Sequence, residues 1–177
     1  MPIVLAVGAM LFIAVMAFTG GRRENQQLVK PHAAGLMSVS IQDVDRVEIE
    51  REGRRLVFGR DSGGRWNRES GHTPLPAQAL EHLETSLRFM RVAEPVRVME
   101  RHEWEGTADG DFGLAPARYS VRLSGHGQSI LAVRFGAANP QRVLQYARVD
   151  GRDELYLMPT FVGVEWERLW EHSTIAR

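Results

Sequence analysis

The residues that could do acid–base or metal chemistry in this sequence are six histidines, and their spacing makes no pair of them a ligand set. They are His32, His72, His82, His102, His126 and His172. A helix presents two histidines to one metal ion when they are one turn apart, as in HExxH, and these histidines lack that spacing. His102 stands among acids in Arg101–Glu105 without a second ligand beside it, so we interpret this segment as a solvated loop.

Three acids close to His102 form a second concentration of polar groups: Glu105, Asp109 and Asp111. Carboxylates suit Ca²⁺, but an EF-hand needs ligands at fixed alternating positions, a central glycine and a closing glutamate, and this segment does not meet that frame. An enzyme would need His102 within hydrogen-bond reach of Asp109 or Asp111 in a cleft. The sequence alone does not bring these side chains together.

The absence of cysteine removes thiolate nucleophiles, disulfides, zinc–thiolate sites and iron–sulfur clusters from consideration. The sequence also lacks the nucleophile elbow GxSxG, the phosphate loop GxxxxGK(S/T) and the dinucleotide fingerprint GxGxxG. We therefore predict no catalytic, cofactor-binding or metal-ligating residue and no cofactor. Basic and acidic residues balance at 22 each, so no net charge attracts the chain to nucleic acid, and we predict no nucleic-acid partner.

The first segment of the chain is apolar enough to enter a membrane. From Pro2 to Phe18 it contains no charged residue, and a helix of that length spans about 25 Å at 1.5 Å per residue. Arg22 and Arg23 then provide a polar stop that can reach the lipid headgroups. We predict a transmembrane anchor at residues 1–21 that contacts the lipid bilayer through residues 2–20, a linker at residues 22–42, and a soluble α+β domain at residues 43–177.

Two alternative interpretations of this segment stay open. A cleaved signal peptide has a basic start, a shorter apolar run and a small residue before the cleavage point, and Val15-Met16-Ala17 is the one passable site. A buried core helix would also be apolar on all faces, although a polar linker follows directly here.

Beyond the linker, alternating apolar and polar residues predict β-hairpins. In VDRVEIERE, Val47 and Ile49 alternate with charged residues, and a turn at Glu52-Gly53 leads into RRLVFGR. The same pattern predicts a short strand at Trp66, after the turn Asp61–Gly64, and an edge strand at Val96 and Val98. Two more hairpins follow, at residues 118–135 and, across Asp150-Gly151, at residues 143–158.

A change to three- and four-residue spacing predicts two amphipathic helices. Leu80, Leu83, Leu87 and Met90 recur at this spacing after Pro76. A second helix starts at about Thr160, the expected N-cap, and places Val162, Trp166, Leu169 and Trp170 on one side. Because each turn between strands is too short for a parallel crossover, we predict an α+β fold, with an antiparallel β-sheet of hairpins and two amphipathic helices packed on one face, preceded by one N-terminal transmembrane helix.

Several strand and turn signatures resemble the bacterial domain of unknown function 4340. They are VDRVEIER near the start, GRWN at Gly64–Asn67, FGLAP at Phe112–Pro116, the strand ending Phe135-Gly136, YARVDG at Tyr146–Gly151 and ELYLMP at Glu154–Pro159. The resemblance covers about residues 40–172. It implies a bacterial membrane protein with an extracytoplasmic domain, associated with ABC-type transport components of the gliding-motility kind, and it carries over no catalytic residue.

One anchor and one small sheet domain favour a non-enzymatic accessory or scaffold protein of a bacterial envelope assembly, with a membrane protein as its partner. The alternatives are an extracytoplasmic ligand-binding module that uses a concave sheet face, and an enzyme of unrecognised type. The resemblance implies a single pass through the inner (cytoplasmic) membrane with the soluble domain in the periplasm. Taken literally, the positive-inside rule applied to Arg22 and Arg23 instead places that domain in the cytoplasm.

Overall fold

The computed structural model describes residues 35–71 and 73–175. The predicted transmembrane anchor at residues 1–21 and the linker up to residue 34 lie outside these ranges. Within them, no helix is long and apolar enough to cross a membrane.

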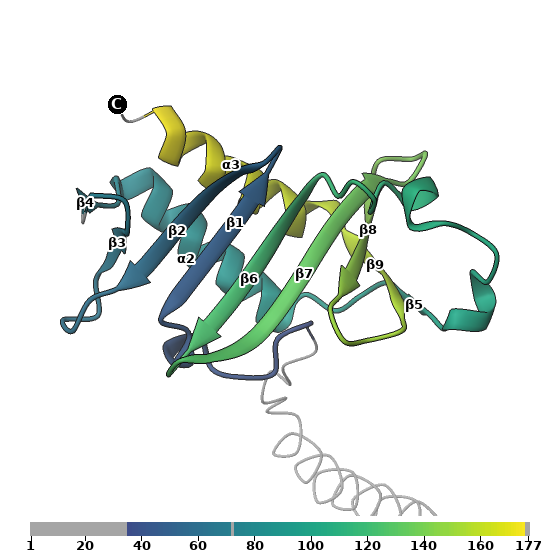
Figure 1. Cartoon of the computed structure of the whole chain (residues 1–177), viewed down its shortest axis with the longest axis horizontal. Helices are drawn as coiled ribbons and strands as arrows, with labels where there is room; N and C mark the ends of the chain where they lie inside the picture. Colours follow the sequence, from purple (N-terminus) through teal and green to yellow (C-terminus); the bar gives the residue numbers. More distant parts are fainter. Residues whose placement is uncertain (1–34, 72, 176–177) are drawn as a thin grey trace, which may run out of the picture. The chain divides into compact units, whose positions relative to one another are not determined.

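Nine strands of the described chain form one antiparallel sheet, in the order β4-β3-β2-β1-β6-β7-β8-β9-β5 (Figure 1). The strands are β1 (Arg46–Arg51), β2 (Arg54–Arg60), β3 (Trp66–Arg68), β4 (Thr73–Pro74), β5 (Arg97–Met99), β6 (Tyr119–Gly125), β7 (Gln128–Ala138), β8 (Leu144–Val149) and β9 (Leu155–Pro159). The three predicted hairpins are confirmed as β1/β2, β6/β7 and β8/β9. The edge strand at Val96 and Val98 is confirmed as β5, which pairs with β9.

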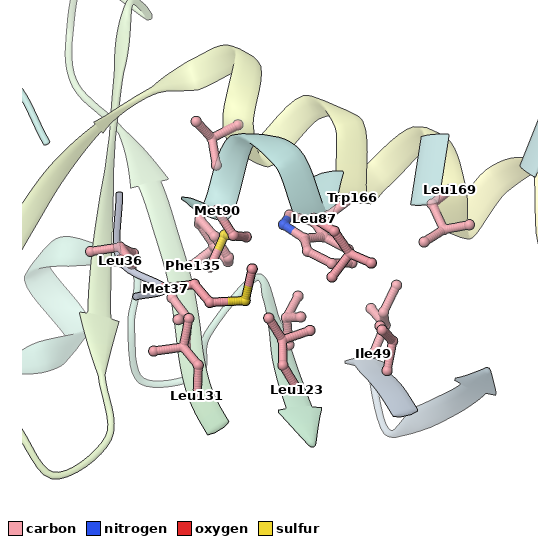
Figure 2. Packing of buried hydrophobic residues seen from close by; sticks show 14 of the residues in the cluster. Leu36, Met37, Ile49, Leu87, Met90, Leu123, Leu131, Phe135, Trp166 and Leu169 are labelled. Carbon is pink, nitrogen blue, oxygen red and sulfur yellow. The ribbon is translucent and has the colours of Figure 1, made fainter. Parts of the chain in front are cut away.

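Two helices of equal length, α2 (Ala77–Val92) and α3 (Thr160–Ile175), lie on the same face of the sheet (Figure 1). The leucine stripe of α2 is buried at Leu83, Leu87 and Met90, and α3 buries Trp166 and Leu169. Figure 2 shows that Leu87, Met90, Trp166 and Leu169 of the helices face inward residues of the strands, such as Ile49 and Leu123. The predicted α+β fold, with an antiparallel sheet and two helices, is therefore confirmed.

The packed domain begins earlier than residue 43, its predicted start after the linker at residues 22–42. Leu36 and Met37 are buried in the main core (Figure 2). The short 3₁₀ helix η2 (Ile41–Asp43) then starts at a capping box, in which Ser40 and Asp43 bond each other's backbone. Two adjacent buried apolar residues make no helical or strand period, which is why the sequence pattern did not reveal them.

Thr160 does not cap α3 in the predicted way. Its hydroxyl donates to the carbonyl oxygens of Arg142 and Val143, at 3.3 and 3.0 Å, instead of accepting from a helix N–H. Thr160 thereby ties the first turn of α3 to the turn before β8.

The chain repeats one topology twice around the centre of the sheet. Strands β1 to β4 run outward from the centre and are followed by α2, and β6 to β9 run outward on the other side and are followed by α3. Since β1 and β6 are antiparallel neighbours, the two halves are related by an approximate two-fold rotation. The sequence showed this order only as two hairpin-and-helix runs, and β5 is an additional strand at one edge.

Candidate functional site: the open face of the sheet

The face of the sheet away from the helices carries ordered charged side chains. Along β1, Val47 and Ile49 point to the core, so the alternation of a strand places Glu48 on the opposite, open face. Glu48 accepts from Arg122 of β6 at 3.1 Å and lies 3.4 Å from Nε of Arg55 of β2. One carboxylate thus links guanidinium groups from the two strands that flank it.

A second charged group lies on β7 and β8, where Arg134 and Arg148 stand directly opposite each other. Two cations in such positions repel each other unless an anion lies between them. Asp109 supplies that anion, because its two carboxylate oxygens lie 2.6 Å from Nη1 of Arg148 and 3.5 Å from Nη1 of Arg134. Asp150 lies 3.5 Å from Nε of Arg134 on the other side.

Asp109 reaches the sheet from the segment between β5 and β6, which forms a small second core on the open face. Trp104, Leu114 and Leu155 are buried in it. The guanidinium carbons of Arg101 and Arg148 lie 3.9 and 4.8 Å from the centre of the Trp104 ring. The aromatic and ionic contacts together fix this segment over β8 and β9.

An ion pair fastens the same segment to β5. Arg97 of β5 donates to Glu103 of the 3₁₀ helix η3 (Arg101–Glu103) at 2.5 Å. This hydrogen bond, supported by the backbone N–H of Glu100, lowers the pKa of Glu103 below its ordinary value of 4.5. Glu103 is therefore held in its charged form.

Between the two charged groups the open face is slightly hollowed. The depression has a volume of about 140 Å³ and is lined by Glu48, Glu50, Ser120, Val121, Arg122, Ala132, Val133, Arg134 and Asp150. Its rim carries both signs of charge at fixed positions, because the ion pairs hold the side chains. Its volume is smaller than that of a typical pocket for a small organic ligand.

The structure does not assemble the acid–base site that His102 would need. His102 is exposed and lies 3.4 Å from Glu100, while Asp109 is bound to arginines. Asp111 accepts from the backbone N–H of Ala108 at 3.1 Å within the 3₁₀ helix η4 (Asp109–Phe112). No hydrogen bond or ion pair joins His102 to either aspartate in the described region. The described residues contain no group of three His, Asp or Glu side chains that could hold a metal ion, and Glu105, Asp109 and Asp111 do not form such a group.

Two of the other histidines come together between the helices, which the sequence did not reveal. His82 of α2 and His172 of α3 stack with ring centroids 5.0 Å apart. Nδ1 of His82 lies 2.8 Å from Oε2 of Glu165, whose other oxygen accepts from Arg168 at 2.8 Å. The i,i+3 spacing of Glu165 and Arg168 was the available signal, but nothing in the sequence placed His82 beside them. His126 lies in the exposed β6/β7 turn, and His32 and His72 are outside the described residues.

A groove of about 490 Å³ lies beside β2 and the C-terminal end of α3. It is lined by Arg54, Arg55, Leu56, Arg68, Trp170 and Thr174. The guanidinium carbon of Arg54 lies 5.4 Å from the centre of the Trp170 ring, and Arg68 donates to the backbone carbonyl of Ser173 at 3.1 Å. This groove is basic, in contrast to the balanced open face.

Comparisons with protein-family models, with curated proteins and with solved structures found no match for this chain. The resemblance to the domain of unknown function 4340 therefore stays a prediction.

Proposed function

We propose that this protein is a single-pass membrane-anchored accessory or scaffold protein of a bacterial envelope assembly, with the open face of the sheet as the surface that binds a membrane-protein partner. The ordered, charge-balanced open face is the observation that supports the proposal. The resemblance adds an association with an ABC-type transport system and a periplasmic location at the inner membrane.

The charges of the open face suit a protein partner better than a nucleic acid or a lipid surface. Its acids include Glu48, Glu50, Asp109 and Asp150, and its arginines include Arg55, Arg122, Arg134 and Arg148. A phosphate backbone or an anionic lipid surface selects a surface of one sign. A mixture of both signs at fixed positions selects instead a partner surface with the complementary mixture, which sets orientation and specificity.

The attachment of the chain at residue 35 supports a role as an anchored domain. Gly35 and Met37 donate their backbone N–H groups to the carbonyl oxygens of Arg91 and Met90, both at 2.9 Å. A Cβ on Gly35 would overlap the Met90 carbonyl, so this close approach requires glycine. The chain coming from the predicted anchor is thus fixed to the last turn of α2.

Site-specific photo-crosslinking in the native membrane tests this proposal. A photoreactive amino acid at Arg122, on the open face, should give a discrete adduct with one membrane protein, and the same amino acid at Glu84, exposed on α2, should give none. Equal labelling from both positions, or a protein that elutes alone after mild detergent extraction, contradicts the proposal. Arg122→Glu should abolish an adduct formed from Ser120, because it reverses one charge of the face.

The basic groove favours a second candidate function, that of an extracytoplasmic ligand-binding module. Arg54, Arg68 and Trp170 would suit a small carboxylate or phosphate compound with an apolar portion. Isothermal titration calorimetry with inorganic phosphate and with aromatic carboxylates tests this candidate function. Binding that is lost in Arg54→Ala but kept in Arg65→Ala, which alters an exposed arginine of the β2/β3 turn, would favour this candidate over the scaffold.

A further inference from the structure

The large apolar side chains that are exposed in the described region all belong to segments that meet at one end of the domain. They are Val92 (45% exposed), Val96 (63%), Val98 (46%), Val143 (58%), Phe161 (49%) and Val164 (38%). They come from the end of α2, from β5 and the residue before it, from the turn before β8, and from the first turns of α3. Together with Phe89, we call these residues the apolar end.

Contacts between the two helices join the first part of the apolar end. The rings of Phe89 and Phe161 meet edge to face, with centroids 4.8 Å apart. Val92 follows Phe89 by three residues and Val164 follows Phe161 by three, so each valine lies on the same helix face as its phenylalanine. The ring contact therefore joins the face of α2 that carries Val92 to the face of α3 that carries Val164.

Backbone hydrogen bonds bring the remaining residues to the same place. Thr160, next to Phe161, donates its N–H to the carbonyl of Val143 at 3.1 Å. Val96 donates its N–H to the carbonyl of Leu157, in the strand that leads directly into α3, at 2.9 Å. Val98 stands opposite Tyr156, whose side chain is in the main core, so Val98 also faces the helix layer.

The fold itself does not require apolar residues at these positions. The two-fold repeat relates α3 to α2 residue by residue from their first residues, Thr160 and Ala77. At the positions of Phe161 and Val164, α2 has Gln78 and Glu81, which are also exposed. The related end of the molecule is polar there, so a contiguous apolar surface at this end indicates contact with an apolar environment.

The chain enters the domain beside the apolar end, and its preceding segment indicates that the apolar environment is a lipid bilayer. Gly35 and Met37 are bonded to the last turn of α2, directly before Val92 (Figure 1). The uncharged run that ends at Phe18 precedes them in the sequence, separated only by residues 19–34. Those residues contain Arg22, Arg23 and Lys30 against a single acid, Glu24.

The rim of the apolar end is also basic. Arg91 precedes Val92, Arg142 precedes Val143, and Arg88 precedes Phe89, with Glu94 as the acid between α2 and β5. Exposed valine and phenylalanine side chains with arginines next to them in the sequence are typical of surfaces that enter the boundary between lipid headgroups and acyl chains.

We propose that the apolar end rests on the bilayer that holds residues 2–18, with Phe161 and the valines at the acyl boundary and Arg91 and Arg142 at the phosphates of anionic phospholipid. The inference rests on the anchoring part of the proposed function. It adds a second, reversible contact with the membrane, which fixes the orientation of the anchored domain.

Single-cysteine labelling of the full chain tests this contact, since the sequence has no cysteine of its own. The single cysteine of each variant, Phe161→Cys or Gln78→Cys, is labelled with an environment-sensitive nitrobenzoxadiazole probe. Each labelled chain is then placed in nanodiscs of phosphatidylcholine and phosphatidylglycerol. Gln78 is the matched control, because it has the same place in α2 as Phe161 has in α3. The probe at residue 161 should shift to shorter emission wavelength and be quenched severalfold more than the control by lipids that carry a shallow nitroxide.

Each other outcome overturns the inference in a distinguishable way. Equal quenching at both positions in protein-loaded discs refutes the membrane contact and leaves the anchor intact. A chain that dissociates from the discs refutes the anchor and the contact together. Protection of residue 161 that requires two copies per disc, and that lipid quenchers do not reach, identifies a second copy as the occupant instead.

A polar variant provides an independent readout that does not depend on a probe at Phe161. Phe161→Gln combined with Val164→Glu transfers the residues of α2 to the related positions of α3, where both side chains are exposed. A probe at Val143→Cys should be quenched by the lipids in the parent chain and fall to the level of the Gln78→Cys control in this variant. Unchanged quenching at residue 143 contradicts the proposal.

Discussion

His82 of α2 and Glu165 of α3 occupy the same place, the sixth residue, in two helices of equal length, and Nδ1 of His82 lies 2.8 Å from Oε2 of Glu165. Residues related by the approximate two-fold repeat face each other where they approach its axis. Near this axis the imidazole of His82 faces the carboxylate of Glu165, so two different groups that attract each other meet there instead of two identical groups. This contact makes the helix layer asymmetric in chemistry although it is symmetric in topology.

A double-mutant cycle should show that this contact stabilises the helix layer. Both side chains are largely buried, with 18% and 12% of their surface exposed, so solvent screens the interaction little. We expect a coupling of about 1–2 kcal/mol between His82→Ala and Glu165→Gln in urea unfolding. Arg168→Ala, which removes a 54% exposed guanidinium from the same carboxylate, should cost less than about 1 kcal/mol. If the effects of His82→Ala and Glu165→Gln on the free energy of unfolding are additive, the contact between these two side chains does not stabilise the helix layer.

Asp109→Asn should loosen the segment that covers β8 and β9. The substitution removes the carboxylate that lies between Arg134 and Arg148 and leaves only Asp150 beside Arg134, so we expect a loss of about 1–3 kcal/mol in the free energy of unfolding. Limited proteolysis should then cut between residues 100 and 117 faster than in the parent chain. Asp153→Asn, at an exposed position, should change neither measurement. Unaltered proteolysis of Asp109→Asn would show that the arginines do not hold the segment.

Gly163→Ala should destabilise the protein although alanine favours helices. A Cβ at residue 163 would overlap Oε1 of Gln145 and lie 2.5 Å from the hydroxyl oxygen of Tyr119. Gln145 cannot easily withdraw, because its side-chain amide donates to the carbonyl of Gly136 at 2.9 Å. We expect a loss of about 1–3 kcal/mol in thermal or urea unfolding, and little change for Val164→Ala on the exposed side of α3. A Gly163→Ala variant that is more stable than the parent chain would contradict this prediction, because it would mean that Gln145 and Tyr119 move aside for the added methyl group.

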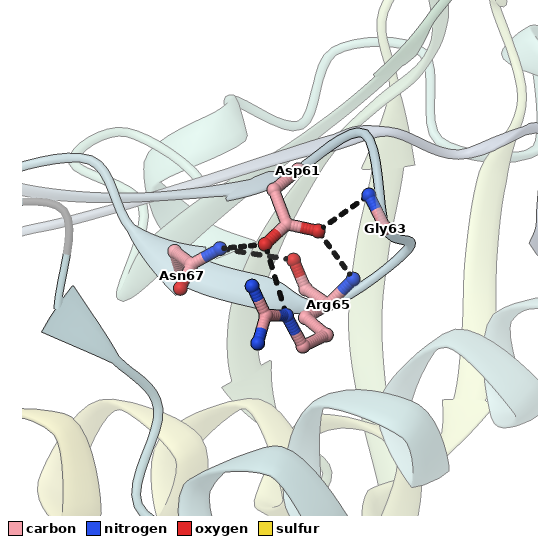
Figure 3. Close-up of polar contacts among 4 residues, drawn as sticks. All are labelled: Asp61, Gly63, Arg65 and Asn67. Carbon is pink, nitrogen blue, oxygen red and sulfur yellow. Dashed lines mark hydrogen bonds and ion pairs between the residues drawn. The ribbon is translucent and has the colours of Figure 1, made fainter.

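The β2/β3 turn has one carboxylate at its centre (Figure 3). Asp61 accepts the backbone N–H groups of Gly63 and Arg65, both at 2.9 Å, and the side chains of Arg65 and Asn67 donate to its other oxygen. The backbone hydrogen bond from Arg65, followed by the side-chain bonds, lowers the pKa of Asp61 below its ordinary value of 3.8.

This lowered pKa predicts a specific acid dependence of stability. A carboxyl whose pKa is lower in the folded state stabilises the fold above its unfolded-state pKa, and that contribution is lost as the pH falls through its folded-state pKa. The parent chain should therefore exceed Asp61→Asn in stability at neutral pH, and the difference should shrink below pH 3.8. Urea midpoints measured on both sides of this pH check the prediction, and a difference that is constant with pH would contradict it.

Local patterns predicted the elements of this fold well. Val47 and Ile49 are buried in β1 as their alternation indicates, and Leu83 and Leu87 are buried in α2 as their spacing indicates. Both patterns record the contact of one face of an element with the core, which is a local property of the sequence.

The partners of the elements were harder to predict, because they depend on tertiary packing. β5 has only three residues, and its pairing with β9 follows from the path of α2 across the sheet. The contact of Asp109 with Arg134 and Arg148 joins a loop to two strands, and the contact of His82 with Glu165 joins two helices far apart in sequence. Spacing within one element carries no information about such pairs, so the sequence pattern indicated Asp109 only as one of several loop acids.

The proposed anchoring of the domain by residues 2–18 is tested most directly by alkaline carbonate extraction of membranes that contain the full chain. We predict that the chain stays in the membrane pellet and keeps its first eighteen residues. Met10→Arg, which puts a charge at the middle of the run at a cost of about 2.5–3.5 kcal/mol, should move the chain toward the soluble fraction. A parent chain that washes off with carbonate, or that is isolated without its first eighteen residues, would contradict the account.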